Sequence, residues 1–87
     1  MGKAMKEYAV VYEWGPKNWS AYVPDLPGCV TTGWTREETE RNIKEAIELH
    51  LEVLRDTGRP IPEPTSRVGM VVVAVDMPDG DPARAAA

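Results

Sequence analysis

The sequence predicts an α+β fold in which a single helix covers one face of a four-stranded mixed sheet. Three observations predict it. Short segments rich in β-branched and aromatic residues alternate with turn residues over 8–32, a long stretch without glycine or proline follows over 36–57, and a valine-rich run occupies 67–76. The elements therefore follow one another as β-β-β-α-β, and 87 residues leave room for one domain.

The first three strands are predicted to form an antiparallel meander. The segments 8–14 and 19–23 are β-branched and aromatic, and the four residues between them form a turn of hairpin length. Pro24 and Pro27 cannot donate backbone hydrogen bonds to a neighbouring strand, so the second strand ends before them. A short third strand is predicted over 29–32.

The helix is marked by signals at both of its ends. Thr35 and Glu38 have the spacing of a capping box, which satisfies backbone N–H groups at a helix start. The helix is predicted over 36–57, with Gly58 at its C-terminal cap and Pro60 beyond it as a stop. Its apolar residues fill an arc wider than half of the helix surface. They are Ile43, Ala46, Ile47, Leu49, Leu51, Val53 and Leu54.

The connector after the helix determines the predicted strand order. Residues 59–66 contain three prolines, which favour a stiff polyproline II path of about 3.1 Å per residue. This connector is longer than a step to a neighbouring strand requires, and it suits a sideways step across three strand spacings, roughly 14 Å. The last strand, over 67–76, is therefore expected beside the first. The sheet then has the order 3-2-1-4 with a right-handed crossover.

The last strand is apolar on both of its faces. Side chains of alternate residues leave opposite faces of a sheet, and one helix covers only one of them. With no further helix in the domain, another polypeptide is the natural cover for the second face. We therefore expect a homo-oligomer, either a dimer or a dimer of dimers. One face carries Val68, Met70, Val72 and Ala74, and the other carries Val71, Val73 and Val75.

Net charge and the numbers of cysteine and histidine residues limit the possible classes of function. Fourteen acidic residues stand against ten basic ones, which gives a net charge of −4 and a pI near 4.9. Nucleic-acid binders usually show the opposite balance, whereas an acidic surface suits a basic protein partner. One cysteine and one histidine exclude an internal disulfide and a zinc module, so no metal or cofactor is predicted. With no targeting segment and no apolar run long enough for a membrane span, the cytoplasm is the expected compartment.

No complete acidic active site is visible. A β-β-β-α-β sheet in the order 3-2-1-4 is the front half of a ribonuclease H-like fold, whose enzymes place an acid midway along the first strand. Here Val10 and Val11 occupy that place, while Glu13 and Asp76 lie at strand ends. We therefore expect no enzyme activity. The alternative is a divergent nuclease that holds metal ions with Glu13, Asp76 and a helix glutamate.

Cys29 and His50 are the other candidates for chemistry. A nucleophile pair would need the imidazole beside the thiol. A free cysteine more often behaves as a small buried hydrophobe, and a lone histidine on an apolar helix face more often packs against a polar partner. We therefore predict no catalytic residue, with a Cys29–His50 pair or a pH-sensing His50 as the alternatives.

Three stretches of the chain carry a family pattern. They are Tyr22-Val-Pro-Asp-Leu-Pro-Gly-Cys-Val-Thr31, residues 42–50 (Asn-Ile-Lys-Glu-Ala-Ile-Glu-Leu-His) and residues 58–64 (Gly-Arg-Pro-Ile-Pro-Glu-Pro). Together they resemble the HicB family of antitoxins. The resemblance implies a partial, catalytically degenerate ribonuclease H-like fold. It also implies a single HicB-like domain, predicted over 1–76. From Met77 onward the composition is mainly Pro, Asp, Gly and Ala, which predicts a flexible C-terminal tail over 77–87.

The resemblance also implies a function and a partner. HicB proteins neutralise HicA, a small basic toxin that cleaves mRNA, so the chain is expected to bind and occlude a HicA-type toxin without catalysing a reaction. Many HicB proteins carry a C-terminal DNA-binding segment, but only eleven residues follow Asp76, and direct DNA binding is therefore not expected. The alternative is a solitary HicB-like regulatory or binding module without a cognate toxin.

Part of the interaction surface is predicted at the turn after the second strand. This turn consists of Pro24, Asp25, Leu26, Pro27, Gly28 and Cys29. The alternative is that its two prolines and its glycine only turn the chain. A further class of function, a small-ligand or RNA-binding regulator, would use Lys17 and the aromatic rings of Trp14, Trp19 and Trp34, but the acidic charge opposes it.

Overall fold

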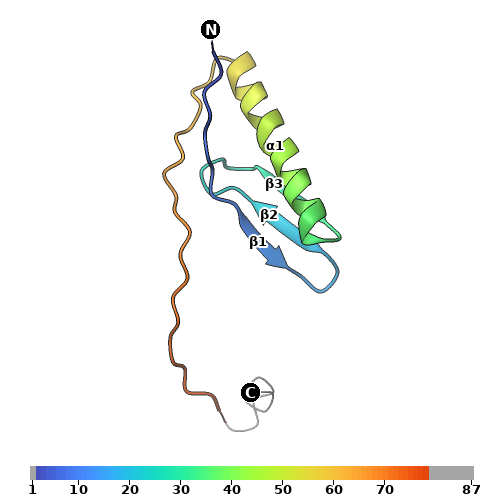
Figure 1. Cartoon of the computed structure of the whole chain (residues 1–87), viewed down its shortest axis with the longest axis vertical. Coiled ribbons are helices and arrows are strands. Elements are labelled where there is room, and N and C mark those ends of the chain that lie inside the picture. Colours follow the sequence, from blue (N-terminus) through green and yellow to red (C-terminus); the bar gives the residue numbers. More distant parts are fainter. Residues whose placement is uncertain (1, 79–87) are drawn as a thin grey trace.

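The computed structural model describes residues 2–78. In this part of the chain a three-stranded sheet, with strands β1 (Val11–Trp14), β2 (Trp19–Tyr22) and β3 (Val30–Gly33), is followed by the helix α1 (Arg36–Asp56), as Figure 1 shows. The predicted α+β class, with one helix after three strands, is confirmed.

The sheet is an antiparallel meander in the order β1-β2-β3. Its first turn is closed by a hydrogen bond of 2.8 Å from the Gly15 N–H to the Asn18 carbonyl. The cross-strand register places Tyr12 opposite Ala21 and Ala21 opposite Thr31. Each strand is four residues long, and β1 begins at Val11 rather than at the predicted residue 8.

Helix α1 begins and ends through side-chain and backbone caps that the sequence predicts. The Glu38 N–H donates to the Thr35 hydroxyl at 3.0 Å, and the Glu38 carboxylate accepts from the Trp34 N–H at 3.2 Å. At the other end, Gly58 has a φ of +71°, which a residue with a side chain adopts with strain. The Gly58 and Arg59 N–H groups then donate to carbonyls of the last helical turn, which is a Schellman motif.

The core lies between the helix and the inner face of the sheet. It consists of Ala21, Val23, Leu26, Cys29 and Ile43, each at most 3% exposed. The helix packs mainly on β3 and β2. Its first turn sits tightly on the end of β3, because a Cβ atom at Gly33 would lie only 2.9 Å from the Thr39 backbone nitrogen. The buried Thr39 hydroxyl donates to the Thr35 carbonyl at 2.7 Å.

The predicted fourth strand is corrected by the structure. Residues 67–76 form no strand and pair with no strand among residues 2–78, so only the 3-2-1 part of the predicted 3-2-1-4 order is present in one chain. The segment instead runs out past the sheet (Figure 1). The molecule measures 61 Å along its longest axis, with a radius of gyration of 17.7 Å. A compact chain of this length has a radius of about 12 Å.

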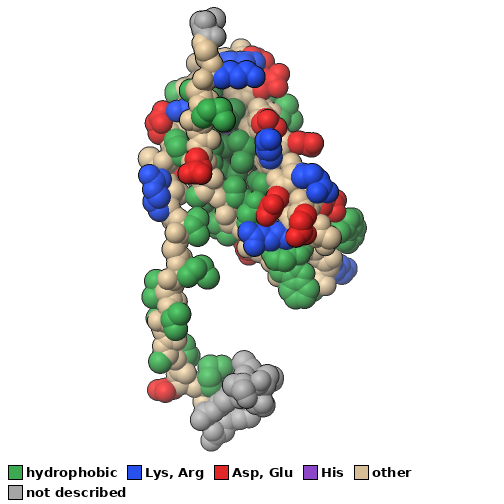
Figure 2. Space-filling model, in the orientation of Figure 1, with side chains coloured by type: hydrophobic (Ala, Val, Ile, Leu, Met, Phe, Trp, Pro, Cys, Tyr) green, Lys and Arg blue, Asp and Glu red, His purple; other side chains and the backbone are tan. Residues whose placement is uncertain are grey.

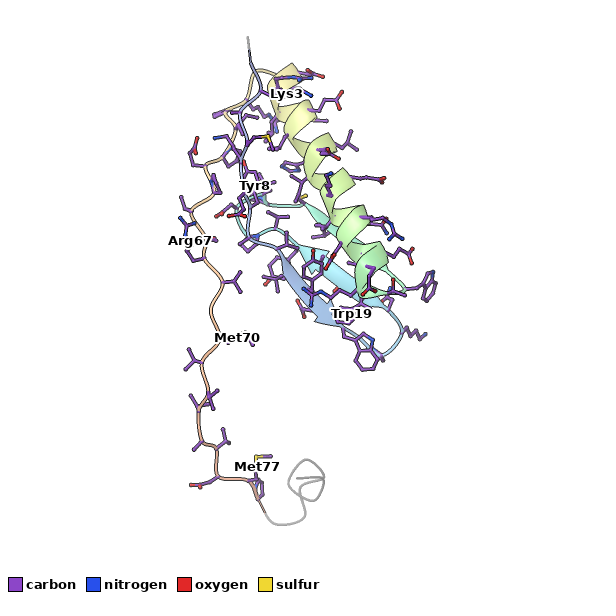
Figure 3. The ribbon with its side chains drawn as sticks, viewed as in Figure 1. Lys3, Tyr8, Trp19, Arg67, Met70 and Met77 are labelled. Atoms are coloured by element: carbon purple, nitrogen blue, oxygen red, sulfur yellow. The ribbon has the colours of Figure 1, made fainter. Side chains whose placement is uncertain are left out.

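The cause of this difference lies at the end of the connector. Residues 62–66 are tied to the N-terminal segment and to the turn after β2, and the chain leaves the body at Arg67 in a direction that diverges from β1 (Figures 1 and 3). The reach of the connector would allow a place beside β1, but the contacts that hold its end decide where the chain goes. The predicted flexible tail over 77–87 lies outside the described residues except for Met77 and Pro78.

Candidate interaction surface

The turn between β2 and β3, where the interaction surface is predicted, is held by its own backbone. The Val23 N–H donates to the Cys29 carbonyl at 3.1 Å, and the Cys29 N–H donates to the Leu26 carbonyl at 3.0 Å. Gly28 has a φ of +83°, a conformation in which glycine is favoured. These bonds fix the conformation of the turn, so some of its side chains always face solvent and the others always face the core.

The six predicted surface residues divide into two groups. Pro24, Pro27 and Gly28 are exposed, whereas Leu26 and Cys29 are fully buried in the core. Asp25 is half-buried and accepts hydrogen bonds from the connector. The outward group offers a contact surface and the inward group builds its support. That the turn contacts a partner stays a prediction.

The Asp25 carboxylate clamps the end of the connector. It accepts hydrogen bonds from the Thr65 and Ser66 N–H groups at 3.0 and 2.9 Å. It also accepts from their hydroxyl groups at 3.2 and 2.8 Å. The Ser66 N–H, followed by the Ser66 hydroxyl, holds the pKa of the Asp25 carboxyl below its ordinary value, because these bonds favour the charged form.

Because of this lowered pKa, the clamp is expected to make stability depend on pH. A depressed pKa in the folded state contributes stability that is present above the unfolded value, about 3.9, and that is lost as the pH falls through the folded value. We expect Asp25→Asn to remove this part of the loss of melting temperature below about pH 4. Thermal unfolding followed by circular dichroism at a series of pH values measures it. Glu48→Gln, on the exposed side of α1, is the control and should leave the acid limb unchanged.

The rest of the connector is fixed against the N-terminal segment. Lys6 forms an ion pair of 2.9 Å with Glu63, and the Tyr8 hydroxyl donates to the Pro62 carbonyl. Burial raises the pKa of the Tyr8 hydroxyl. Residues 6–8 and 62–66 thus lie side by side, as the ribbon in Figure 1 shows.

A groove lies beside the turn, between the β3 edge and the C-terminal half of α1. It has a volume of about 520 Å³, and apolar side chains dominate its lining. Val30, Leu49 and Val53 are 64%, 62% and 51% exposed there, so the groove carries an apolar patch open to solvent. Pro27 and Gly28, from the outward group of the turn, line the same groove. We call this surface the β3–α1 groove.

Cys29 and His50 both line the β3–α1 groove, but they do not form an activated pair. No hydrogen bond joins them within residues 2–78, and Cys29 is buried. Burial raises the pKa of the Cys29 thiol, whereas an activated cysteine has a lowered one. Cys29 is therefore a core residue, as the sequence reading favoured.

The acidic side chains of the described residues do not gather into a metal-binding cluster. No group of three or more Asp, Glu, His or Cys residues among residues 2–78 is placed to hold a metal ion. Glu13 is exposed at the end of β1, and Asp76 is exposed in the segment that leaves the body. On the outer side of α1, acidic and basic side chains are interspersed (Figure 2), and Arg36 pairs with Glu40 at 3.4 Å.

The aromatic residues are dispersed rather than stacked on one basic surface. Trp14 and Trp34 are largely exposed, and Trp19 is half-buried opposite Trp14. The Arg36 guanidinium lies 4.7 Å from the centre of the Tyr12 ring. Within the described range, no helix is long and apolar enough to span a membrane.

Comparison with known proteins identifies the family. Residues 8–80 match the family described as "HicB_like antitoxin of bacterial toxin-antitoxin system". A "UPF0150 protein" of Helicobacter pylori is 54% identical over 41 residues, which cover 47% of this chain and 57% of the relative. A "UPF0150 protein" of Thermotoga maritima is 40% identical over 58 residues, which cover 64% of this chain and 77% of the relative.

A solved structure supports the same family. A chain of a "HicA3 and HicB3 toxin-antitoxin complex" superposes with a TM-score of 0.60 and is 30% identical, covering 69% of this chain and 70% of the other. The family match spans the meander, the helix and the connector described above. The protein belongs to the HicB-like antitoxin family.

Proposed function

We propose that the protein is a non-catalytic antitoxin that binds a small basic toxin of the HicA type and occludes its RNA-cleaving surface. The observation that carries this proposal is the family match over residues 8–80. The likeness to a chain of a solved HicA3–HicB3 complex supports it. An mRNA-cleaving partner works where mRNA is translated, so we place the pair in the cytoplasm.

The charge of the protein supports an encounter with a basic partner. At a net charge of −4, it attracts a basic surface from a distance, and such attraction raises the association rate and weakens as salt is added. Bound in this way, acidic side chains compete with RNA phosphates for the same Lys and Arg residues of the toxin. Occlusion then needs no chemistry by the antitoxin itself.

The β3–α1 groove supplies the apolar contact that such a complex needs. Interface energy concentrates in a few desolvated apolar anchors, surrounded by a polar rim. Leu49 and Val53 are exposed apolar residues on a helix whose outer side is charged, and Val30 extends their patch onto the sheet edge. The exposed turn residues Pro27 and Gly28 line the same groove, and together with the exposed Pro24 of the same turn they complete the proposed toxin-binding surface.

Co-expression with the adjacent basic open reading frame tests the function. We expect the neighbour to arrest growth alone, and this protein to rescue growth and to co-purify with it. Leu49→Asp should weaken binding by at least tenfold, which is about 1.4 kcal/mol, because it places a charge in the apolar contact. Isothermal titration calorimetry at low and high salt measures both the loss and the charge dependence.

Trp34→Asp is the matched control for this experiment. Trp34 is also an exposed apolar residue, at 75%, but it lies at the opposite end of α1 from the groove. The Trp34→Asp variant should still rescue growth. If both variants bind equally well, the groove is not the binding surface. If the neighbour is harmless, or stays toxic beside the folded protein, the antitoxin role is wrong and a solitary binding module replaces it.

A further inference from the structure

The segment 67–76 is extended and pairs with no strand among residues 2–78. Residues 68–75 make no hydrogen bond with any other residue of the described range, and they carry no charged side chain. Their large apolar side chains are 67% to 98% exposed. Figure 2 shows them standing along the segment, and in Figure 3 Met70 lies well clear of the sheet. These side chains are Val68, Met70, Val71, Val72, Val73 and Val75.

Such a segment requires apolar contacts on both of its faces and hydrogen-bond partners for its backbone. A long apolar strand with unpaired N–H and C=O groups is a template for pairing with another strand. Because its alternating side chains are apolar on both faces, its place is inside a sheet that is covered on two sides. A position at a solvent-facing edge would leave one face and one set of backbone groups unsatisfied.

The β1 edge offers a complementary place. β1 is an outer strand of the sheet, and one side of its backbone pairs with no strand of the part of the chain that the structure describes. The helix covers chiefly β3 and β2, and the inward side chains of Tyr8, Val10 and Tyr12 are therefore only half-buried. Val11 points to the outer face, where it lies opposite the exposed Tyr22. A strand added beside β1 would cover apolar side chains on both faces.

The molecule therefore has both an unpaired extended segment, residues 67–76, and an unpaired sheet edge at β1 within the described residues. The Asp25 clamp holds Ser66, and the segment beyond it diverges from its own β1. We infer that two copies of the protein exchange these segments, so that residues 67–76 of each copy lie along β1 of the other. A twofold arrangement of this kind gives each β1 edge a neighbour, and with the two segments side by side at the twofold axis each segment lies inside one continuous sheet.

The chemistry of the segment favours a second copy over the basic toxin as its occupant. Residues 68–75 carry no charged side chain, so they gain nothing from the charge of a basic toxin. The β1 edge has only Glu13 as a charged side chain within Val11–Trp14, so it lacks the charges that usually block strand addition. The apolar segment and the apolar β1 edge are therefore complementary in their chemistry.

The mass of the protein in solution tests the exchange. Sedimentation equilibrium at micromolar concentration should give twice 9.6 kDa, or a multiple of that dimer. Val72→Asp should raise the dimer dissociation constant at least a hundredfold, since Val72 occupies the middle of the segment. Val72 is 98% exposed in a single chain, so a protein that does not use the segment would not respond to this change.

Leu49→Asp is the control and should leave the dimer mass unchanged, because Leu49 lies in the β3–α1 groove. A wild-type mass of 9.6 kDa, or a dimer that persists in Val72→Asp, would overturn the inference. The experiment uses the protein alone, so it stands or falls separately from toxin binding.

The edge that receives the segment is tested on the wild-type protein. A sample that mixes isotope-labelled and unlabelled copies reports only contacts between copies. We expect nuclear Overhauser effects from segment valine methyl groups to the rings of Tyr8 and Tyr12. Effects to Val30 and Leu49 instead would move the segment to the β3 edge and overturn the assignment. The absence of any effect between copies from these methyl groups would overturn the exchange.

Discussion

Replacing Ile43 with alanine is expected to lower the free energy of unfolding by about 2–5 kcal/mol. Ile43 is 2% exposed and is the helix residue at the centre of the core, where it packs with the buried side chains of the sheet and turn. The substitution deletes buried aliphatic carbons together with their packing contacts, and it leaves a cavity that the small core cannot fill. In a domain of this size each kcal/mol lowers the melting temperature by about 4–8 °C, so a fall of at least 8 °C is expected. Thermal and urea unfolding, followed by circular dichroism, measure it.

Leu49→Ala provides the matched control for Ile43→Ala. Leu49 is also a large aliphatic residue on α1, but it is 62% exposed in the groove. Its truncation should change the free energy of unfolding by no more than about 0.5 kcal/mol. Equal losses from the two substitutions would mean that the helix face turned toward the sheet is wrongly assigned.

Leu26→Ala is expected to have a comparable effect, although it lies within the predicted partner-binding turn. Leu26 is 0% exposed, and its N–H and C=O groups both take part in the backbone bonds of the turn. Loss of its side chain should lower the free energy of unfolding by about 2–5 kcal/mol and loosen the position of the whole turn. Partner binding would then fall through loss of folded protein and not through loss of a contact.

The control for Leu26→Ala is Val30→Ala, at the first residue of β3, which is 64% exposed. It should leave unfolding nearly unchanged and is therefore suited to measuring binding at this surface. If Leu26→Ala unfolds at the wild-type urea concentration but no longer binds the partner, Leu26 contacts the partner directly. The inward orientation of its side chain would then be wrong.

The elements that the sequence predicts well are those with local signals. The helix is bracketed by Thr35 with Glu38 and by Gly58, and the structure uses each of these residues as a cap. The three strands and their order follow from turns that leave no alternative to pairing neighbours. Only their ends differ, because Tyr8 turns toward the connector and does not pair with β2.

The fourth strand could not be placed in this way. Its position depends on Asp25 binding Thr65 and Ser66, which are 40 and 41 residues further along the chain. An aspartate after a proline, and a Thr-Ser pair after another, are common in turns and do not point to each other. The composition of residues 67–76 predicts a strand, but it does not state which chain supplies the neighbour.

The candidate surface was predictable only in part. A turn has no periodicity, so the sequence does not show which of the residues 24–29 face outward, although the apolar Leu26 and Cys29 are the natural inward ones. The β3–α1 groove had a better signal. The apolar arc of the helix is wider than one sheet face can cover, and its excess residues, Leu49 and Val53, are those left exposed.

The position of Cys29 has a practical consequence, because it is the sole thiol of the chain. Cys29 is 3% exposed and burial raises the pKa of its thiol, so alkylating reagents react with it mainly when the core opens. The rate of alkylation at Cys29 therefore counts opening events of the folded protein without any introduced label. The Cys29 backbone closes the turn beside the groove, so a bound partner that stabilises the turn should lower the rate of alkylation. The ratio of the alkylation rates without and with the partner then gives the protection that binding confers.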